Sequence, residues 1–228
     1  MKPRPPIGRR IVNGVVSGLA AASALLGLLA LAWIFLGVLS RGVGALNLDF
    51  FTRLPNPPGI PGGGLANAIV GTLAMTGLAT LLAVPVGMMA GVFLSEFGQK
   101  SRLADHSRFA ANVLMGMPSI IIGVFVYAIL VLPRGKFSGY AGALSLGIIM
   151  LPVVARTAED MLRLLPNTLR EAGLALGAPT WKVTLTILFR AAKPGLLTGI
   201  LLAVARVSGE TAPLLFTCLL YTSPSPRD

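Results

Sequence analysis

The stretch GLLTGILLAVARVSGETAPLLF, residues 195 to 216, decides how this chain folds. It is apolar and long enough to cross a bilayer, since about 20 such residues span the hydrocarbon core. Yet Arg206 and Glu210 stand inside it, four residues apart. An Arg at the bilayer centre costs at least about 2.5 kcal/mol, so such a residue faces protein or a water-filled cavity. The stretch therefore predicts a membrane helix whose charged face is turned away from lipid.

The whole chain has the composition of an integral membrane protein. Apolar residues make up 54% of it, charged residues 12%, and the mean hydropathy is +0.80. A soluble domain has about 25% charged residues. The net charge of +11 would suggest nucleic acid as a partner of a soluble protein. In a membrane protein, Lys and Arg are instead retained on the cytoplasmic side, so we expect membrane lipid and no nucleic acid around this chain.

Apolar runs predict an all-α, polytopic membrane helical bundle with five spans. They cover Ile11 to Leu39 and, approximately, residues 65–94, 109–132, 140–155 and 194–216. Three spans contain glycines four residues apart, a pattern that lets helices approach closely: Gly14/Gly18, Gly87/Gly91 and Gly195/Gly199. Residues 1–10 form a basic cytoplasmic head, and the apolar run after it is too long for a signal-peptide core.

The distribution of basic residues predicts the orientation of the chain. With the N-terminus in the cytoplasm, 13 Lys and Arg residues lie on that side and 4 on the other. Cytoplasmic loops carry this excess, so the count favours a cytoplasmic N-terminus. Glu96, Glu159 and Asp160 are then expected to lie on the solvated cytoplasmic surface.

Side chains that would indicate an enzyme are missing from the sequence. His106 and Cys218 are the single His and Cys, which leaves no metal-ligand cluster. No GxxxxGK[ST] motif occurs, so the chain has no nucleotide site of that kind. No nucleophile stands with a base and an orienting group. The sequence therefore predicts no catalytic residues, no metal and no cofactor in this chain.

A polar segment at about 156–193 contains TLREAGLALGAPTW, residues 168 to 181. Thr168 and Glu171 have the spacing of a capping box, which predicts a helix beginning there. Gly177 suits the end of that helix, and Pro179 suits the first turn of the next. The two helices either dock into a partner's groove or merely connect spans at the membrane surface. The residues alone leave these alternatives open.

Arg206 and Glu210 raise the same kind of choice. Arg206 lies 12 residues after Pro194, or roughly 18 Å along a helix, near the middle of the core. Glu210 follows at i+4, on the same face of a continuous helix, so the two can pair. Gly209 and Pro213 weaken regular helix there, and transporters often bind substrate where membrane helices are broken. The pair is either part of a substrate path, with the hydroxyls of Ser208 and Thr211, or a structural ion pair. Arg156 is a weaker candidate for the path and is more typical of a topology-setting charge.

Several motifs resemble those of a known transporter family. EAGLALG at residues 171–177, followed by Ile187, is similar to the EAA loop of ABC-importer permeases. Glu171, Ala172, Gly177 and Ile187 match that pattern, whereas Gly173 replaces an alanine and Phe189-Arg190 replaces Leu-Pro. GETAPLL, residues 209–215, resembles the signature of A-type permease subunits of phosphate ABC importers, the Pst system. So do MPSI at residues 117–120 and FLSEF at residues 93–97. The resemblance covers about residues 10–217.

This resemblance implies a permease domain at about residues 11–217 and a function in phosphate import by alternating access. It implies six spans, so we expect the chain to be C-terminally truncated and its tail, residues 218–228, to be anomalous. The implied partners are a cytoplasmic ABC ATPase dimer that binds ATP and Mg, a second homologous permease subunit, and an extracytoplasmic phosphate-binding protein. The implied location is the inner membrane of a prokaryote. The alternatives are a permease for sulfate, molybdate or phosphonate, and a non-transporting membrane scaffold.

Overall fold

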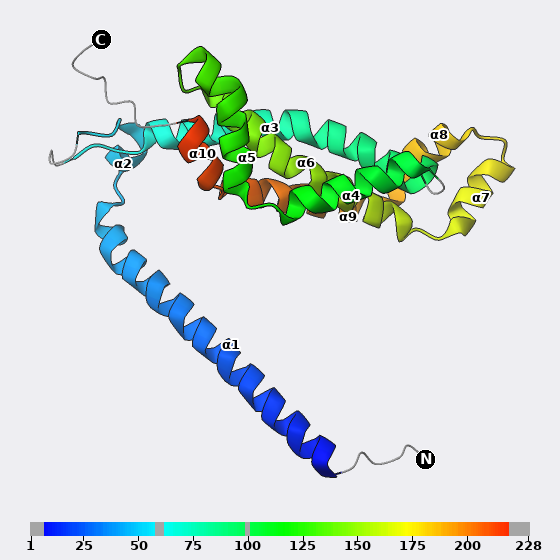
Figure 1. Cartoon of the computed structure of the whole chain (residues 1–228), viewed down its shortest axis with the longest axis horizontal. Helices are drawn as coiled ribbons and strands as arrows, with labels where there is room; N and C mark the ends of the chain where they lie inside the picture. Colours follow the sequence, from blue (N-terminus) through cyan, green and yellow to red (C-terminus); the bar gives the residue numbers. More distant parts are fainter. Residues whose placement is uncertain (1–6, 58–61, 99–100, 219–228) are drawn as a thin grey trace. The chain divides into compact units, whose positions relative to one another are not determined.

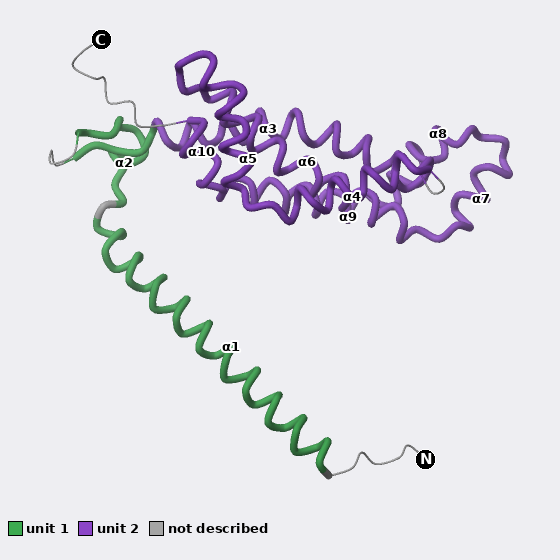
Figure 2. Tube along the Cα trace, in the orientation of Figure 1, with its two compact units in different colours: residues 1–66 green, residues 67–228 purple. Residues whose placement is uncertain are grey.

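The computed structural model describes residues 7–57, 62–98 and 101–218, and every regular element in these ranges is a helix. The chain divides into two compact units, residues 1–66 and 67–228 (Figure 2). Most of the basic head and the tail from residue 219 lie outside the described residues, so the expectations about both stay predictions.

Unit 1 contains the long helix α1 (Ile7–Gly42), a short 3-10 turn η1 (Val43–Ala45) and α2 (Leu48–Thr52). α1 is apolar, and its side chains from Gly8 to Gly42 are not covered by the rest of unit 1. A helix that is apolar on all sides is typical of a membrane span. A Cβ added at Gly14 or Gly18 would meet no atom of unit 1 within 4 Å, so within the described part of this unit the glycine pair packs on no other helix. α2 begins at Asn47, whose side chain accepts a hydrogen bond from the amide of Phe50 at 2.8 Å.

Unit 2 is a helical bundle built around α6 (Gly139–Arg163), and Figure 1 shows α6 running through its middle. α3 (Ala66–Val92) and α9 (Phe189–Ser208) pack along α6. The other helices are α4 (Arg102–Gly116), α5 (Ser119–Val126), α7 (Asn167–Ala175), α8 (Thr180–Val183) and α10 (Ala212–Thr217). The described part of unit 2 also contains three π-helical turns. η2 (Phe93–Phe97) extends α3, η3 (Tyr127–Val131) extends α5, and η5 (Thr184–Leu188) joins α8 to α9. A 3-10 turn, η4 (Leu132–Arg134), follows η3.

Small residues let α3 and α9 approach α6 closely. A Cβ added at Gly91 would lie 2.7 Å from the carbonyl oxygen of Ala155, and one at Gly87 would lie 2.9 Å from Cβ of Val154. On α9, a Cβ at Gly199 would collide with the side chain of Thr157. Two of the three glycine pairs noted in the sequence therefore lie at helix contacts, as expected of small residues in membrane bundles.

The third span, predicted at about residues 109–132, is not one continuous helix but is broken near its middle. α4 and the helix after it meet at an angle of 101°. Met117 adopts extended backbone angles, because the residue before a proline disfavours the helical region, and Pro118 cannot donate a helical hydrogen bond.

The broken pair nevertheless crosses the whole bundle. At its beginning, Arg108 contacts Glu159 near the C-terminal end of α6, and towards its other end Val131 shares a buried cluster with Ala141 at the start of α6. With the four long apolar helices, it brings the number of candidate spans to five.

The fourth and fifth spans extend further into the polar segment than predicted. α6 continues to Arg163 rather than ending near Ala155, and the helical run of the fifth span begins at Thr180 rather than Pro194. Pro194 lies inside α9 without ending it. The polar segment between the spans is consequently short and consists mainly of α7.

Candidate functional site

Two helix breaks face one cavity inside unit 2. Its volume is about 240 Å³. The α4–α5 break contributes Met117, Pro118 and Ser119, and the α9–α10 break contributes Arg206 and Glu210. Apolar residues of α6, Ile149 and Val153, form part of its wall. Broken helices that line a cavity at membrane depth are the arrangement in which transporters place substrate and ion sites.

The break at residues 209–211 was predicted from Gly209 and Pro213, and the structure confirms it. α9 ends at Ser208, Gly209 is its C-cap, and α10 begins at Ala212 with Pro213 in its first turn. α10 stays packed on α5, because a Cβ at Gly123 would lie 2.6 Å from Cα of Pro213. Residue Ser138, just before α6, donates a backbone hydrogen bond to the carbonyl of Thr217 at 3.2 Å, which fixes the end of α10.

Arg206 and Glu210 do not form the ion pair that their spacing would allow on a continuous helix. Two residues at i and i+4 share a face only while the helix continues, and here it ends between them. Within the described residues, neither side chain takes part in an ion pair or a side-chain hydrogen bond, although both line the cavity. A guanidinium group and a carboxylate are therefore both free to meet a solute.

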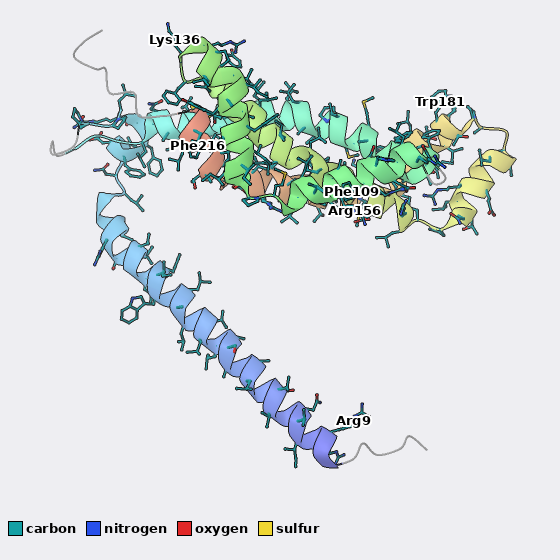
Figure 3. All side chains as sticks on the ribbon, viewed as in Figure 1. Arg9, Phe109, Lys136, Arg156, Trp181 and Phe216 are labelled. Atoms are coloured by element: carbon teal, nitrogen blue, oxygen red, sulfur yellow. The ribbon has the colours of Figure 1, made fainter. Side chains whose placement is uncertain are left out.

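The structure does not bring the other predicted path residues into this cavity. The hydroxyl of Ser208 donates to the carbonyl of Ala205 at 2.8 Å, within its own helix. Thr211 is the exposed N-cap residue of α10. Arg156 contacts Asp160 at 3.3 Å and Glu159 at 3.4 Å on α6, and Figure 3 shows it well apart from Phe216 of α10. A role for these three residues in the path stays a prediction.

A buried ion network surrounds Glu159, and the expectation that this residue is solvated is wrong. Glu159 is 0% exposed. Its carboxylate accepts from Nε of Arg108 at 2.7 Å and contacts Arg163 at 2.8 Å, so its charge is compensated from α4 and from its own helix. Arg108 also donates to the carbonyl of Leu94 at 2.8 Å and pairs with Asp105 at 2.9 Å. The network joins α3, α4 and α6 at one end of the bundle.

One signal for this network was present in the sequence. Arg156, Glu159, Asp160 and Arg163 have the i+3 and i+4 spacing of ion pairs on a continuous helix, which indicates that α6 extends beyond residue 155. The contribution of Arg108 had no such signal, because it comes from a different helix.

Glu96 was also expected to be solvated, and this expectation is wrong as well. Its side chain is 5% exposed, and it binds Arg170 of α7. FLSEF, residues 93–97, is a π-helical turn, η2, at the end of α3.

The residues of the EAA-like segment lie on and around α7. Glu171 and Ala172 are exposed on that helix. Gly177 follows its end with φ +77°, a left-handed conformation that suits glycine. Ile187 belongs to η5 and approaches Gly173, where an added Cβ would lie 3.0 Å from its Cδ1. The predicted capping box does not form, because α7 begins one residue before Thr168 and its N-cap is Pro166. Pro179 likewise lies at the N-cap of α8 rather than in its first turn.

A larger cavity of about 500 Å³ lies beside η5 and α9. Its wall is mainly apolar, with Arg190 and Lys193 among the residues that line it. No helix break opens into it, whereas two breaks and two unpaired charges meet at the smaller cavity. We therefore take the smaller cavity as the candidate solute site.

Comparisons with known proteins identify the fold and the family. Residues 83–227 match the family model of the binding-protein-dependent transport system inner membrane component. The chain is 47% identical over 211 residues to the phosphate transport system permease protein PstA of Haemophilus influenzae, covering 92% of this chain and 74% of that protein. It is 41% identical to the phosphate transport system permease protein PstA 1 of Mycobacterium tuberculosis, covering 91% and 69%.

A solved structure of the methionine ABC transporter MetNI in an inward-facing conformation is similar in fold. The TM-score is 0.58 and the identity 24%, over 66% of this chain and 72% of that one. The family model and these relatives show the family directly. The chain belongs to the PstA family of permease proteins, within the binding-protein-dependent transport system inner membrane components.

Proposed function

We propose that this chain is a transmembrane subunit of an ATP-driven importer that carries inorganic phosphate into the cytoplasm by alternating access. The observation that carries the proposal is the cavity at which Arg206 and Glu210 meet, unpaired, between two broken helices. The names of the relatives, which are phosphate permeases, support the choice of solute. The chain is a transport subunit rather than an enzyme.

The two charged side chains suit a partly protonated oxyanion. The guanidinium group of Arg206 matches phosphate oxygens in a bidentate fork. The carboxylate of Glu210 accepts a hydrogen bond from the proton that phosphate carries at neutral pH. Sulfate has no such proton and would face an uncompensated carboxylate in a cavity, which is unfavourable. The same cavity that admits phosphate therefore disfavours sulfate.

The remaining subunits supply what this chain lacks. A cytoplasmic ATPase dimer would bind ATP and Mg and dock against α7, where Glu171 and Ala172 are exposed. A second homologous permease subunit would complete the pathway, and an extracytoplasmic binding protein would deliver phosphate. The proposed orientation has the N-terminus in the cytoplasm, as the excess of basic residues on that side supports, and it would put α7 on the side of the ATPase.

Uptake by the complete complex in sealed proteoliposomes tests this function. With ATP enclosed and the binding protein outside, labelled phosphate should accumulate. A tenfold excess of unlabelled phosphate should suppress accumulation, whereas equal excesses of sulfate, molybdate and a phosphonate should not. If one of these oxyanions suppressed the accumulation of labelled phosphate as strongly as unlabelled phosphate does, the chain would be assigned to that oxyanion. ATP-independent or absent uptake would favour a non-transporting scaffold.

A further inference from the structure

One side chain joins α7 to the membrane helix α3. Arg170 lies on α7, and Glu96 lies in η2, which continues α3. Nε of Arg170 donates to one carboxylate oxygen of Glu96 at 3.0 Å, and Nη2 donates to the other at 2.8 Å. Such a two-bond fork fixes orientation as well as distance. The side chains are 16% and 5% exposed, so water screens the pair only weakly.

Arg170 also binds the end of α6. Its Nη2 donates to the carbonyl of Leu162 at 2.7 Å and its Nη1 to that of Leu165 at 2.9 Å. These carbonyls lie at the C-terminal end of a helix, where backbone acceptors lack helical partners. The hydrogen bond with Glu96 raises the pKa of Arg170 above its ordinary value although burial opposes it, so the guanidinium stays charged. One residue of α7 therefore holds α3 and α6 together.

Apart from the ion pair, α7 reaches α3 through a shared apolar cluster around Leu162 and Leu188, against which Leu169 of α7 and Val92 of α3 both pack. Gly173 is its one buried residue within the described chain, and it faces Val183 and Ile187 of the following segment. Beside the Glu96–Arg170 pair lies a cavity of about 410 Å³, lined also by Leu174 and Thr184. Side-chain packing does not fill this space, so the ion pair is the direct tie between α7 and the end of α3.

We propose that Glu96 and Arg170 are positioning residues that transmit movement of α7 to α3, so that ATP hydrolysis beneath α7 drives the membrane helices. This rests on the proposed function. α3 packs through Gly87 and Gly91 on α6, and α6 carries Ile149 and Val153 of the candidate solute cavity. A displacement of α7 thus reaches the cavity wall through the ion pair and the α3–α6 contact, and also through the bonds of Arg170 to the carbonyls at the end of α6.

The ratio of ATP hydrolysed to phosphate imported, measured on the complete complex in proteoliposomes, tests the link. Glu96→Gln removes the charge but keeps the size of the side chain, and Arg170→Lys keeps the charge but loses the fork. Each should raise the ratio about fivefold or more, a typical allosteric coupling, with assembly unchanged. The double variant should equal Arg170→Lys, because that substitution already breaks the pair with Glu96 and Glu96→Gln then has nothing further to remove. Asp49→Asn, which breaks the exposed Arg53–Asp49 pair, is the control and should leave the ratio unchanged.

An unchanged ratio in both single variants would overturn the proposal. So would loss of assembly in both variants, because the pair would then be purely structural. Should the wild-type complex import no phosphate, the proposed function fails, and amide exchange still decides the link. ATP should alter the protection of residues 167–175 and 90–97 together in the wild type, but only that of 167–175 in Glu96→Gln. If ATP still altered the amide protection of both segments in Glu96→Gln, the proposed link would be overturned.

Discussion

Replacement of Gly91 by Ala should separate α3 from α6. The new Cβ would lie 2.7 Å from the carbonyl oxygen of Ala155 and closer still to Cβ of Ala158. Ordinary contacts are about 3.5 Å, so the helices must move apart by about 0.8 Å or more. Neither obstacle is a flexible side-chain end that can turn away. Overpacking of this kind costs about 1–3 kcal/mol, against a gain of about 0.5–1 kcal/mol for replacing a helical glycine by Ala.

Gly77 provides a matched control on the same helix. A Cβ added there meets no atom within 4 Å, so Gly77→Ala should show only the gain in helix propensity. The free energies of unfolding of both variants are compared with the wild type, with the purified chain in mixed detergent micelles. Gly91→Ala should be less stable than Gly77→Ala by about 1–3 kcal/mol, which is the packing cost alone. Equal stabilities would refute the close contact of α3 with α6.

Two further substitutions probe the polar end of the bundle. Glu159→Gln removes the buried carboxylate that Arg108 and Arg163 share and leaves Arg108 with the exposed Asp105 alone, so it should lower the free energy of unfolding by about 3 kcal/mol. Asp160→Asn next to it, in a half-exposed pair, should cost less than about 1 kcal/mol. Similar losses would contradict the network. Gly177→Ala should lower the free energy of unfolding by about 1 kcal/mol because φ is +77° at this position. Gly177→Asn should lower it less, because Asn tolerates this left-handed conformation. Thermal unfolding of the two variants measures the difference, and equal melting temperatures would argue against a left-handed residue there.

The features predictable from the sequence were those that depend on neighbouring residues. Apolar runs predicted where the spans lie, and Gly209 with Pro213 predicted the break between α9 and α10, because both residues act on local backbone. Met117-Pro118 also indicates a break, between α4 and α5, because a proline and the residue before it both disfavour continued helix. The apolar run around these residues instead favoured one span over about residues 109–132. The same rule that predicted one break would have found the other.

The features missed depend on partners that are distant in the sequence. Glu159 appeared solvated because charged residues are almost never fully buried unless paired, and its partner Arg108 lies on another helix. Glu96 was misplaced for the same reason, since Arg170 is 74 residues away. Arg206 and Glu210 are the opposite case, because their i+4 spacing allows a pair only on a continuous helix and α9 ends at Ser208, between them.

Phosphate uptake by the Arg206→Gln variant, in the complete complex in proteoliposomes, tests the proposed site most directly. Arg206 contributes the one cationic side chain that lines the candidate cavity within the described residues. Lys193→Gln is the control, because Lys193 lies on the same helix but lines a different cavity. Arg206→Gln should abolish uptake while the complex still assembles and hydrolyses ATP, and Lys193→Gln should import phosphate normally. Normal uptake by assembled Arg206→Gln complexes would contradict the assignment of this cavity to the phosphate path.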